Sequence, residues 1–202
     1  MHCVTAYKQA GVDYIKENEI GKYFATIYKL SIFYIRNFEL LPASQLLEDS
    51  LKQYAPKESI EASCDEALLC RLTLAKVRLM NDKRDECFQA CDVVMDKCND
   101  GDKFWIMAME IIAEMNKMKG DLKSASASYE RIIKKMLDTV VVKSKKLNSS
   151  QMKFNTGILI RAVKVFKLTG SVERLKLEDL KDKGVFGQSD TAYLLVLGLS
   201  QW

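Results

Sequence analysis

The sequence has 202 residues, of which 48% are hydrophobic and 29% charged, and it contains only two prolines. A chain of this length and composition can bury a core and is too apolar to remain disordered. The net charge of +4 favours no class of partner, but its distribution is uneven. Residues 1–100 hold 13 Lys and Arg against 16 Asp and Glu, whereas residues 101–202 hold 18 against 11. The second half therefore favours an acidic partner.

The first half of the chain predicts helices throughout. Residues 3–17 have the apolar spacing of one amphipathic helix, which suits the second helix of a hairpin whose first half is missing. A helical hairpin is predicted over residues 19–56. Its first helix is apolar but too short and too often interrupted by Lys and Arg to span a membrane. Pro42 falls in the first turn of its second helix, where the missing N–H costs nothing.

Two further hairpins are predicted over residues 59–100 and 102–138. Gly101, between them, suits a left-handed cap, and the second of these hairpins bends at Gly120-Asp121. Three adjacent valines at residues 140–142 are compatible with a short extended piece or with the end of a long helix, and we favour the helix.

The last part of the chain predicts a fourth hairpin over residues 148–184 and a final packing helix over 189–202. Gly170 marks the turn of this hairpin, and Ser171 is expected to cap its second helix. No polar helix closes the chain, although solenoids usually require one. We therefore expect either a piece of a longer protein or an end that packs back on the last hairpin.

Small and large side chains recur at fixed distances from the predicted turns. Seven residues before the turn stand Ser31, Ala75 and Ala113, and five residues after it stand Ala43, Cys87 and Ala125. Four positions further on are Leu47, Cys91 and Tyr129. Two antiparallel helices approach closely only where small side chains let the backbones meet, and larger ones fill the gaps beside them.

This pattern resembles the tetratricopeptide repeat family. The third hairpin matches best, with Ala113, Gly120, Ala125, Tyr129 and Ile132 in the family's order. The family's early Trp and final Pro are absent, and successive hairpins are longer than its usual repeat of about 34 residues. The resemblance implies an all-α fold, in which antiparallel hairpins stack as one domain in a right-handed superhelix.

The same resemblance implies a protein–protein interaction scaffold that holds an extended or helical partner segment in a concave groove. First helices of the hairpins line such a groove. The implied groove residues are Tyr28, Ile32, Ile35, Arg36, Leu72, Lys76, Leu79, Met80, Met107, Glu110, Glu114, Lys117 and Met118. Ile160, Lys164 and Lys167 would continue it in the fourth hairpin. The alternative is that the apolar members, methionines included, only fill the core between helices.

Neither catalysis nor a metal is predicted. The chain has no phosphate-binding, dinucleotide-binding, zinc-protease or nucleophile-elbow motif, so we expect neither an enzyme nor a cofactor. Its six cysteines lack zinc-site spacing, and its one histidine is His2. The cysteines are expected to be reduced and mostly buried, which together with a start unlike a signal peptide indicates a cytoplasmic or nuclear protein.

Two other functions remain open from the sequence. A structural piece could self-associate through its ends, at Val4–Ile15 and Thr191–Trp202. A helical array could instead bind nucleic acid through a lysine cluster, although no aromatic residues are interleaved for base stacking, which disfavours nucleic acid. That basic patch comprises Lys134, Lys135, Lys143, Lys145 and Lys146, and Lys153 lies close to it in sequence.

Overall fold

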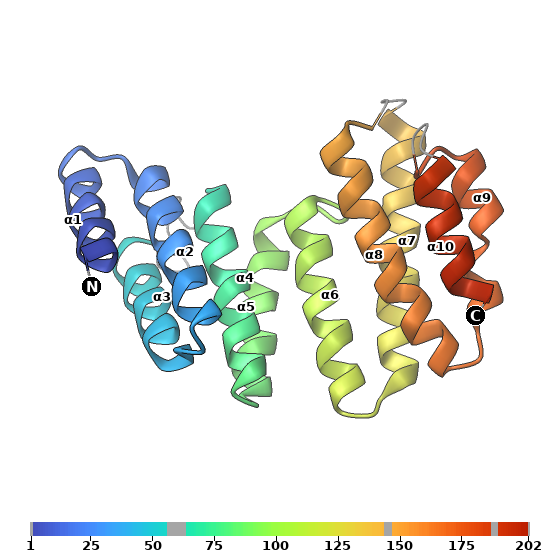
Figure 1. Cartoon of the computed structure of the whole chain (residues 1–202), viewed down its shortest axis with the longest axis horizontal. Helices are drawn as coiled ribbons and strands as arrows, with labels where there is room; N and C mark the ends of the chain where they lie inside the picture. The colour runs from blue at the N-terminus through green and yellow to red at the C-terminus, as the bar shows by residue number, and fades with distance from the viewer. Residues whose placement is uncertain (1, 56–63, 144–146, 187–189, 202) are drawn as a thin grey trace. The chain divides into compact units, whose positions relative to one another are not determined.

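The computed structural model describes residues 2–55, 64–143, 147–186 and 190–201. Helices make up nearly all of these residues, and none of them forms a strand, so the predicted all-α class is confirmed. The chain divides into two compact units, residues 1–99 and residues 100–202, where the sequence predicted one domain. Figure 1 shows the antiparallel helices within each unit.

Among the residues that the structure describes, the first unit contains five helices. Consecutive helices pack against each other up to α5, and α2 also packs against α4. The first helix, which the sequence treated as half of a missing hairpin, therefore pairs with α2. The helices are α1 (His2–Lys16), α2 (Ile20–Arg36), α3 (Leu40–Tyr54), α4 (Asp65–Met80) and α5 (Arg84–Lys97).

Side chains of α2, α3 and α4 form the core of this unit. Phe24, Leu47 and Leu74 are among its buried members. Within this core, the Tyr23 hydroxyl donates to Ser50 Oγ at 2.9 Å. Pro42 lies in the first turn of α3, as predicted.

The second unit also consists of helices packed on their neighbours. α6 packs on α7, α7 on α8, and α10 on both α8 and α9. Helix α7 continues through the three valines, so the helical alternative for that stretch is confirmed. The elements are α6 (Lys103–Met118), α7 (Leu122–Lys143), α8 (Ser149–Leu168), the 3₁₀ helix η2 (Val172–Leu175), α9 (Leu177–Asp182) and α10 (Asp190–Gln201).

Nearly the same turn joins the helices of five pairs. The residue after each helix cap has a positive φ, and its N–H donates to the carbonyl three residues earlier. The next N–H reaches back five residues, and this pair of hydrogen bonds is the Schellman motif. The left-handed residues are Asn18, Phe38, Asp82, Gly120 and Gly170. The residue that follows each of them begins the next helix as its N-cap, so turn and helix start are fixed together.

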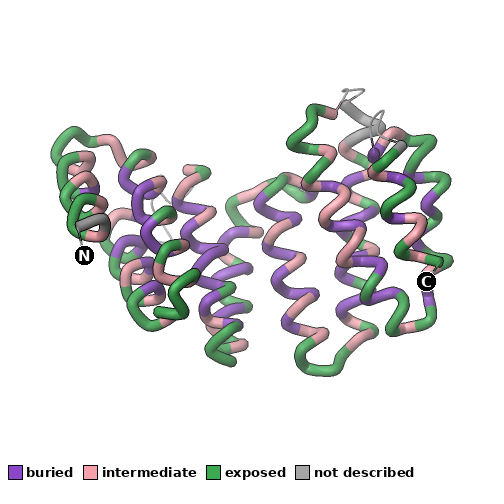
Figure 2. The backbone as a smooth tube through the Cα atoms, viewed as in Figure 1, coloured by how far each residue is buried: buried purple, intermediate pink, exposed green. Residues whose placement is uncertain are grey.

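The predicted small-residue positions are fully buried. Ser31, Ala75 and Ala113, seven residues before the left-handed residue, have no exposed surface. The same holds for Ala43, Cys87 and Ala125 on the second helices. Buried positions follow the faces along which neighbouring helices of a unit meet (Figure 2). Gly11 occupies the same position in α1 and is also buried, which brings the ring of Tyr23 to 3.5 Å from where a Cβ would lie.

The fourth hairpin differs from its prediction. Its second helix is broken into η2 and α9 at Lys176, which has a φ of 43°. The Ser171 side chain makes no capping hydrogen bond, so the predicted cap is wrong. A continuous helix would put residues 175 and 177 on nearly opposite faces. The break lets both Leu175 and Leu177 be buried.

Gly101 adopts a φ of 91°, the left-handed conformation that the sequence predicted. It does not cap α5, which ends earlier in an extended residue. A Cβ on Gly101 would also lie 3.3 Å from Lys135 Cβ and from Thr139 Oγ1. Glycine is therefore favoured both by the backbone angle and by the close approach to α7. In the part of the chain that the structure describes, no helix combines the length and apolarity needed to cross a membrane.

Candidate functional site

The predicted groove residues of the first unit divide into exposed and buried positions. Tyr28, Ile32 and Ile35 on α2 are partly exposed, and Arg36 is exposed. On α4, Lys76 is exposed and 55% of Met80 is accessible. The remaining two predicted residues, Leu72 and Leu79, are only 1% and 8% accessible, so they pack inside the unit.

The predicted groove residues of the second unit lie on α6, where the charged ones make polar contacts and the two methionines are accessible. Glu114 accepts hydrogen bonds from Lys117 Nζ at 2.8 Å and from the Tyr129 hydroxyl at 3.3 Å. Glu110 is ion-paired with Arg161 of α8. Met107 is partly exposed, and Met118 is 54% accessible. Burial, followed by the carboxylates of Glu114 and Glu110, raises the pKa of Tyr129.

The fourth-hairpin candidates lie on α8. Ile160 is partly exposed, and Lys164 and Lys167 are exposed. Lys167 Nζ donates a hydrogen bond to the carbonyl of Leu199 in α10, at 3.0 Å.

The predicted basic patch is described only in part. Lys134 is exposed, whereas Lys135 forms an ion pair with Asp100 at 3.2 Å. The side chain of Lys143 and both Lys145 and Lys146 lie outside the described residues. Of the five predicted members, the side chains of Lys134 and Lys135 are therefore the ones that the structure describes, and Lys135 is already paired.

The described cysteines are free thiols. Cys70, Cys87 and Cys91 are buried, and Cys64 and Cys98 are partly buried. Burial raises the pKa of the Cys70 thiol. The pKa of Cys91 is raised as well, first by its hydrogen bond with Cys87 and then by burial. Cys70 and Cys91 are therefore protonated at neutral pH and act as small apolar side chains.

Sequence reasoning missed a cleft in the first unit, between α3, α4 and α5. Its volume is about 500 Å³. One wall carries the two arginines of α4, Arg71 and Arg78, and Glu48 and Lys52 of α3 lie opposite. The remaining lining residues are Leu51, Ala55, Leu74, Gln89, Ala90 and Val93. The available signal was Arg71 itself, the single charge in the apolar run of residues 67–75.

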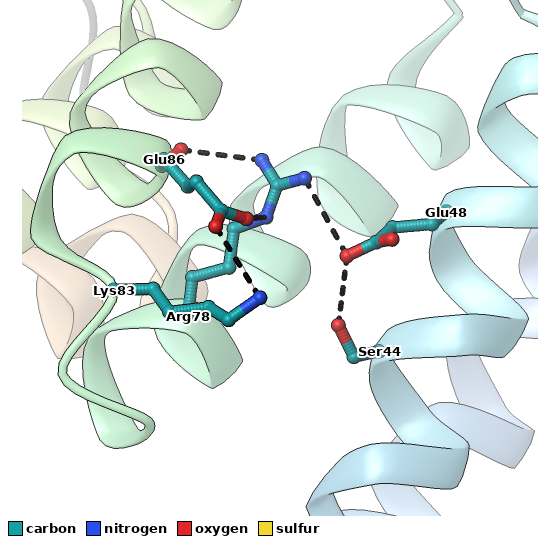
Figure 3. A network of polar contacts seen from close by, with 5 residues as sticks. All are labelled: Ser44, Glu48, Arg78, Lys83 and Glu86. Atoms are coloured by element: carbon teal, nitrogen blue, oxygen red, sulfur yellow. Dashed lines mark hydrogen bonds and ion pairs between the residues drawn. The ribbon is translucent and has the colours of Figure 1, made fainter.

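Arg78 joins three helices at this cleft (Figure 3). Its Nη2 lies 3.5 Å from Glu48 Oε1 on α3, and its Nη1 donates to the Glu86 carbonyl on α5 at 3.2 Å. Its Nε lies 3.3 Å from Glu86 Oε2, an ion pair without the alignment of a hydrogen bond. Ser44 donates to Glu48 Oε1 at 2.9 Å, and Lys83 pairs with Glu86 at 3.3 Å.

Arg71 is placed differently from Arg78. It is 9% accessible, its Nη2 donates to the carbonyl of Ala55, and its Nε has no hydrogen-bond acceptor among the described residues. No described carboxylate lies within ion-pairing distance of it. Burial lowers the pKa of Arg71, which nonetheless remains charged at neutral pH.

A second cleft, of about 410 Å³, lies in the second unit beside the first turns of α6 and α8. Three of its polar side chains already have partners. Asn155 Nδ2 donates to the Val185 carbonyl at 3.3 Å, and Asn148 and Gln151 form a reciprocal capping box at the start of α8. This cleft therefore offers less unsatisfied polar chemistry than the one lined by Arg71.

The arrangement defines a class of protein: an all-helical chain built from antiparallel hairpins with shared turn geometry. No known family matches this sequence, and no curated protein matches it.

Proposed function

We propose that the chain is a divergent tetratricopeptide-like scaffold, stacked as a right-handed superhelix, that binds an extended or helical segment of another protein without catalysis. The packing within the first unit supports this proposal. There, the first helices α2 and α4 lie beside each other, and α3 contacts both. The tetratricopeptide architecture that the sequence resembles uses such neighbouring contacts, and repeat proteins bind partners along the surface that they create.

One observation carries the proposal: corresponding positions of α2 and α4 remain accessible. Tyr28, Ile32 and Ile35 expose apolar surface on α2, and Lys76 and Met80 are exposed on α4. Ile32 and Lys76 each stand six residues before the left-handed turn residue of their hairpin, and Arg36 and Met80 each stand two residues before it, so these two pairs lie on equivalent faces of two neighbouring helices. A surface with apolar and basic members suits an amphipathic partner segment. Tyr28 and Ile35 correspond to Leu72 and Leu79, which are buried in α4.

The test selects peptides from a random display library on the full chain. We expect the peptides to lose at least tenfold in affinity for the double variant Lys76→Glu/Met80→Glu, because it reverses one charge and removes an exposed apolar contact. The matched control is Gln45→Glu on the exposed face of α3. Circular dichroism should be unchanged in both variants. Equal affinity for the double variant and the wild type would contradict the proposed surface.

A second candidate function is self-association through α10. Its buried residues, Tyr193 and Val196, pack inward, while Leu194, Leu195 and Leu199 are exposed on the same short helix. Exposed leucines of this kind commonly mark protein contacts. Light scattering at several protein concentrations tests it. A mass that stays at that of the monomer contradicts self-association, and a dimer that dissociates in Leu194→Glu/Leu195→Glu supports it.

A further inference from the structure

Arg71 carries a buried positive charge that its described surroundings do not neutralise. Arg71 is nine-tenths buried in the first unit, and among the described residues its one acceptor is the neutral carbonyl of Ala55. Removing a charge from water is costly unless an opposite charge and good hydrogen bonds replace the hydration. An apolar side chain of similar length would fill this space without that cost. The position therefore suggests that a counter-charge is supplied from outside the described residues.

The carboxylate that lines the cleft does not neutralise Arg71. Glu48 lines the same cleft, but its Oε1 accepts from Ser44 and faces Arg78. Arg78 is in turn held by Glu86 of α5 (Figure 3). The charges of this network are paired with one another, and Arg71 remains the buried cation of the cleft that no described carboxylate pairs with.

We propose that the cleft between α3, α4 and α5 binds a peptide carboxylate from a partner protein, and that Arg71 forms the ion pair with it. A guanidinium offers a planar fork of N–H donors that matches a carboxylate. A carboxylate has one negative charge, which balances the single charge of the buried Arg71. A phosphate dianion has the same fork geometry but would bring a second charge close to Glu48. Leu51, Leu74 and Val93 in the lining suit an apolar residue beside the carboxylate.

This site is separate from the surface proposed above. Arg71, Leu74 and Arg78 lie on one face of α4, and helical spacing places Lys76 and Met80 on another. The two sites can consequently be tested independently, since a variant at either leaves the other unchanged.

The test uses the full chain and three acetylated dipeptides of nearly the same size, which differ in whether they carry a carboxylate and where it lies. Acetyl-leucyl-glutamate amide carries a side-chain carboxylate, and acetyl-leucyl-glutamine with a free end carries a terminal one. Acetyl-leucyl-glutamine amide carries none. Nitrogen-15 spectra of the arginine Nε–H groups report on Arg71 directly. We expect a saturable shift of the Arg71 signal with one or both carboxylates, no shift with the neutral peptide, and binding at least tenfold weaker in Arg71→Met.

Control variants separate a lost ion pair from lost folding. Lys29→Met removes an exposed cation of α2 that does not line the cleft and should change the affinity by less than threefold. If Arg71→Met fails to fold, Arg71→Lys keeps the charge but lacks the fork, and binding at least fivefold weaker is expected. The groove variant Lys76→Glu/Met80→Glu should bind the dipeptides as the wild type does.

Three results would overturn the proposal. The first is that neither carboxylate peptide shifts the Arg71 signal, or that Arg71→Met binds these peptides as tightly as the wild type does. The second is tighter binding of inorganic phosphate than of either carboxylate. The third is that the double variant Glu58→Gln/Glu61→Gln binds the carboxylate peptides more tightly than the wild type. That result would mean that carboxylates of the chain itself neutralise Arg71.

Discussion

Phe38 occupies a backbone conformation that bulky residues rarely adopt. Its φ is 62°, and its side chain is 87% accessible, so no burial offsets the strain. The left-handed conformation costs an ordinary residue about 1–2 kcal/mol relative to glycine. Glycine, at the corresponding position of two other turns, avoids this cost.

We therefore expect Phe38→Gly to raise the free energy of unfolding by about 0.5–1 kcal/mol, the relief of strain being partly offset by greater freedom of the unfolded chain. Urea unfolding measures the change. Phe38→Ala is the control, because it removes the same side chain and keeps the strain, and its effect should be near zero. A loss of stability in Phe38→Gly would show that the exposed ring contributes to folding.

Tyr129 makes stability depend on alkaline pH. Burial and two nearby carboxylates raise its pKa, so the folded protein holds this proton more tightly than the unfolded chain does. A raised pKa contributes stability that is complete below the unfolded value of about 10 and declines as the pH rises above it. The slope is about 1.4 kcal/mol per pH unit while the folded phenol remains protonated.

Tyr129→Phe should consequently reduce the pH dependence of unfolding above pH 10 by about one proton. Urea unfolding of both proteins at several pH values between 8 and 11 measures the two slopes. The other tyrosines are the same in both proteins and cancel in the comparison. Parallel slopes would contradict a raised pKa at Tyr129.

The helical hairpins depend on small residues at their closest points. Ala113 of α6 is fully buried in its small-residue position. A leucine there would have to displace the neighbouring helix or adopt a strained rotamer, at a cost of about 2–3 kcal/mol or more. Ala127 of α7 is exposed and provides the matched control.

We expect Ala113→Leu to lower the thermal midpoint by roughly 5–10 °C and Ala127→Leu to leave it nearly unchanged. Differential scanning calorimetry measures both midpoints. Similar midpoints for the two variants would mean that the small residue is not needed for close packing.

The hairpins were predictable because their signals are local. Small residues seven positions before and five positions after a turn define which helices pair, and Gly120 and Gly170 mark two turns directly. Asn18 and Asp82 belong to the residue types that tolerate the left-handed conformation, whereas that of Phe38 was not predictable, since the hydrogen bonds of the turn impose it on a residue that does not prefer it. The broken second helix of the fourth hairpin depends on burying Leu175 and Leu177 together, which needs knowledge of α8 beside them.

The candidate site was less predictable than the fold. Spacing placed Lys76 and Met80 on an accessible face, but it could not distinguish them from Leu72 and Leu79, because α4 is covered on several sides. Arg71 is a charge within an apolar run, and the sequence alone does not show that a carbonyl 16 residues earlier accepts its hydrogen bond.

Each compact unit has a core of its own. The first is formed by α2, α3 and α4, and the second includes buried residues such as Ile112, Tyr129 and Phe166. Proteins in which each element contacts mainly its neighbours can fold as separate segments.

We therefore expect residues 1–99 and residues 100–202, expressed separately, each to be helical and to unfold cooperatively. Far-ultraviolet circular dichroism and thermal unfolding test this directly, with the full chain as the reference. A fragment with the spectrum of an unfolded chain would show that its core is insufficient without the rest of the protein.

The shared turn has a consequence for engineering. Because the same three-residue bend recurs in the described part of the chain, we expect the segments Asn37-Phe38-Glu39, Asn81-Asp82-Lys83 and Lys119-Gly120-Asp121 to be interchangeable. Exchanging one for another would preserve the loop length and the angle at which the next helix departs. Inserting a single residue would instead rotate that helix by about 100° and turn its apolar stripe toward water.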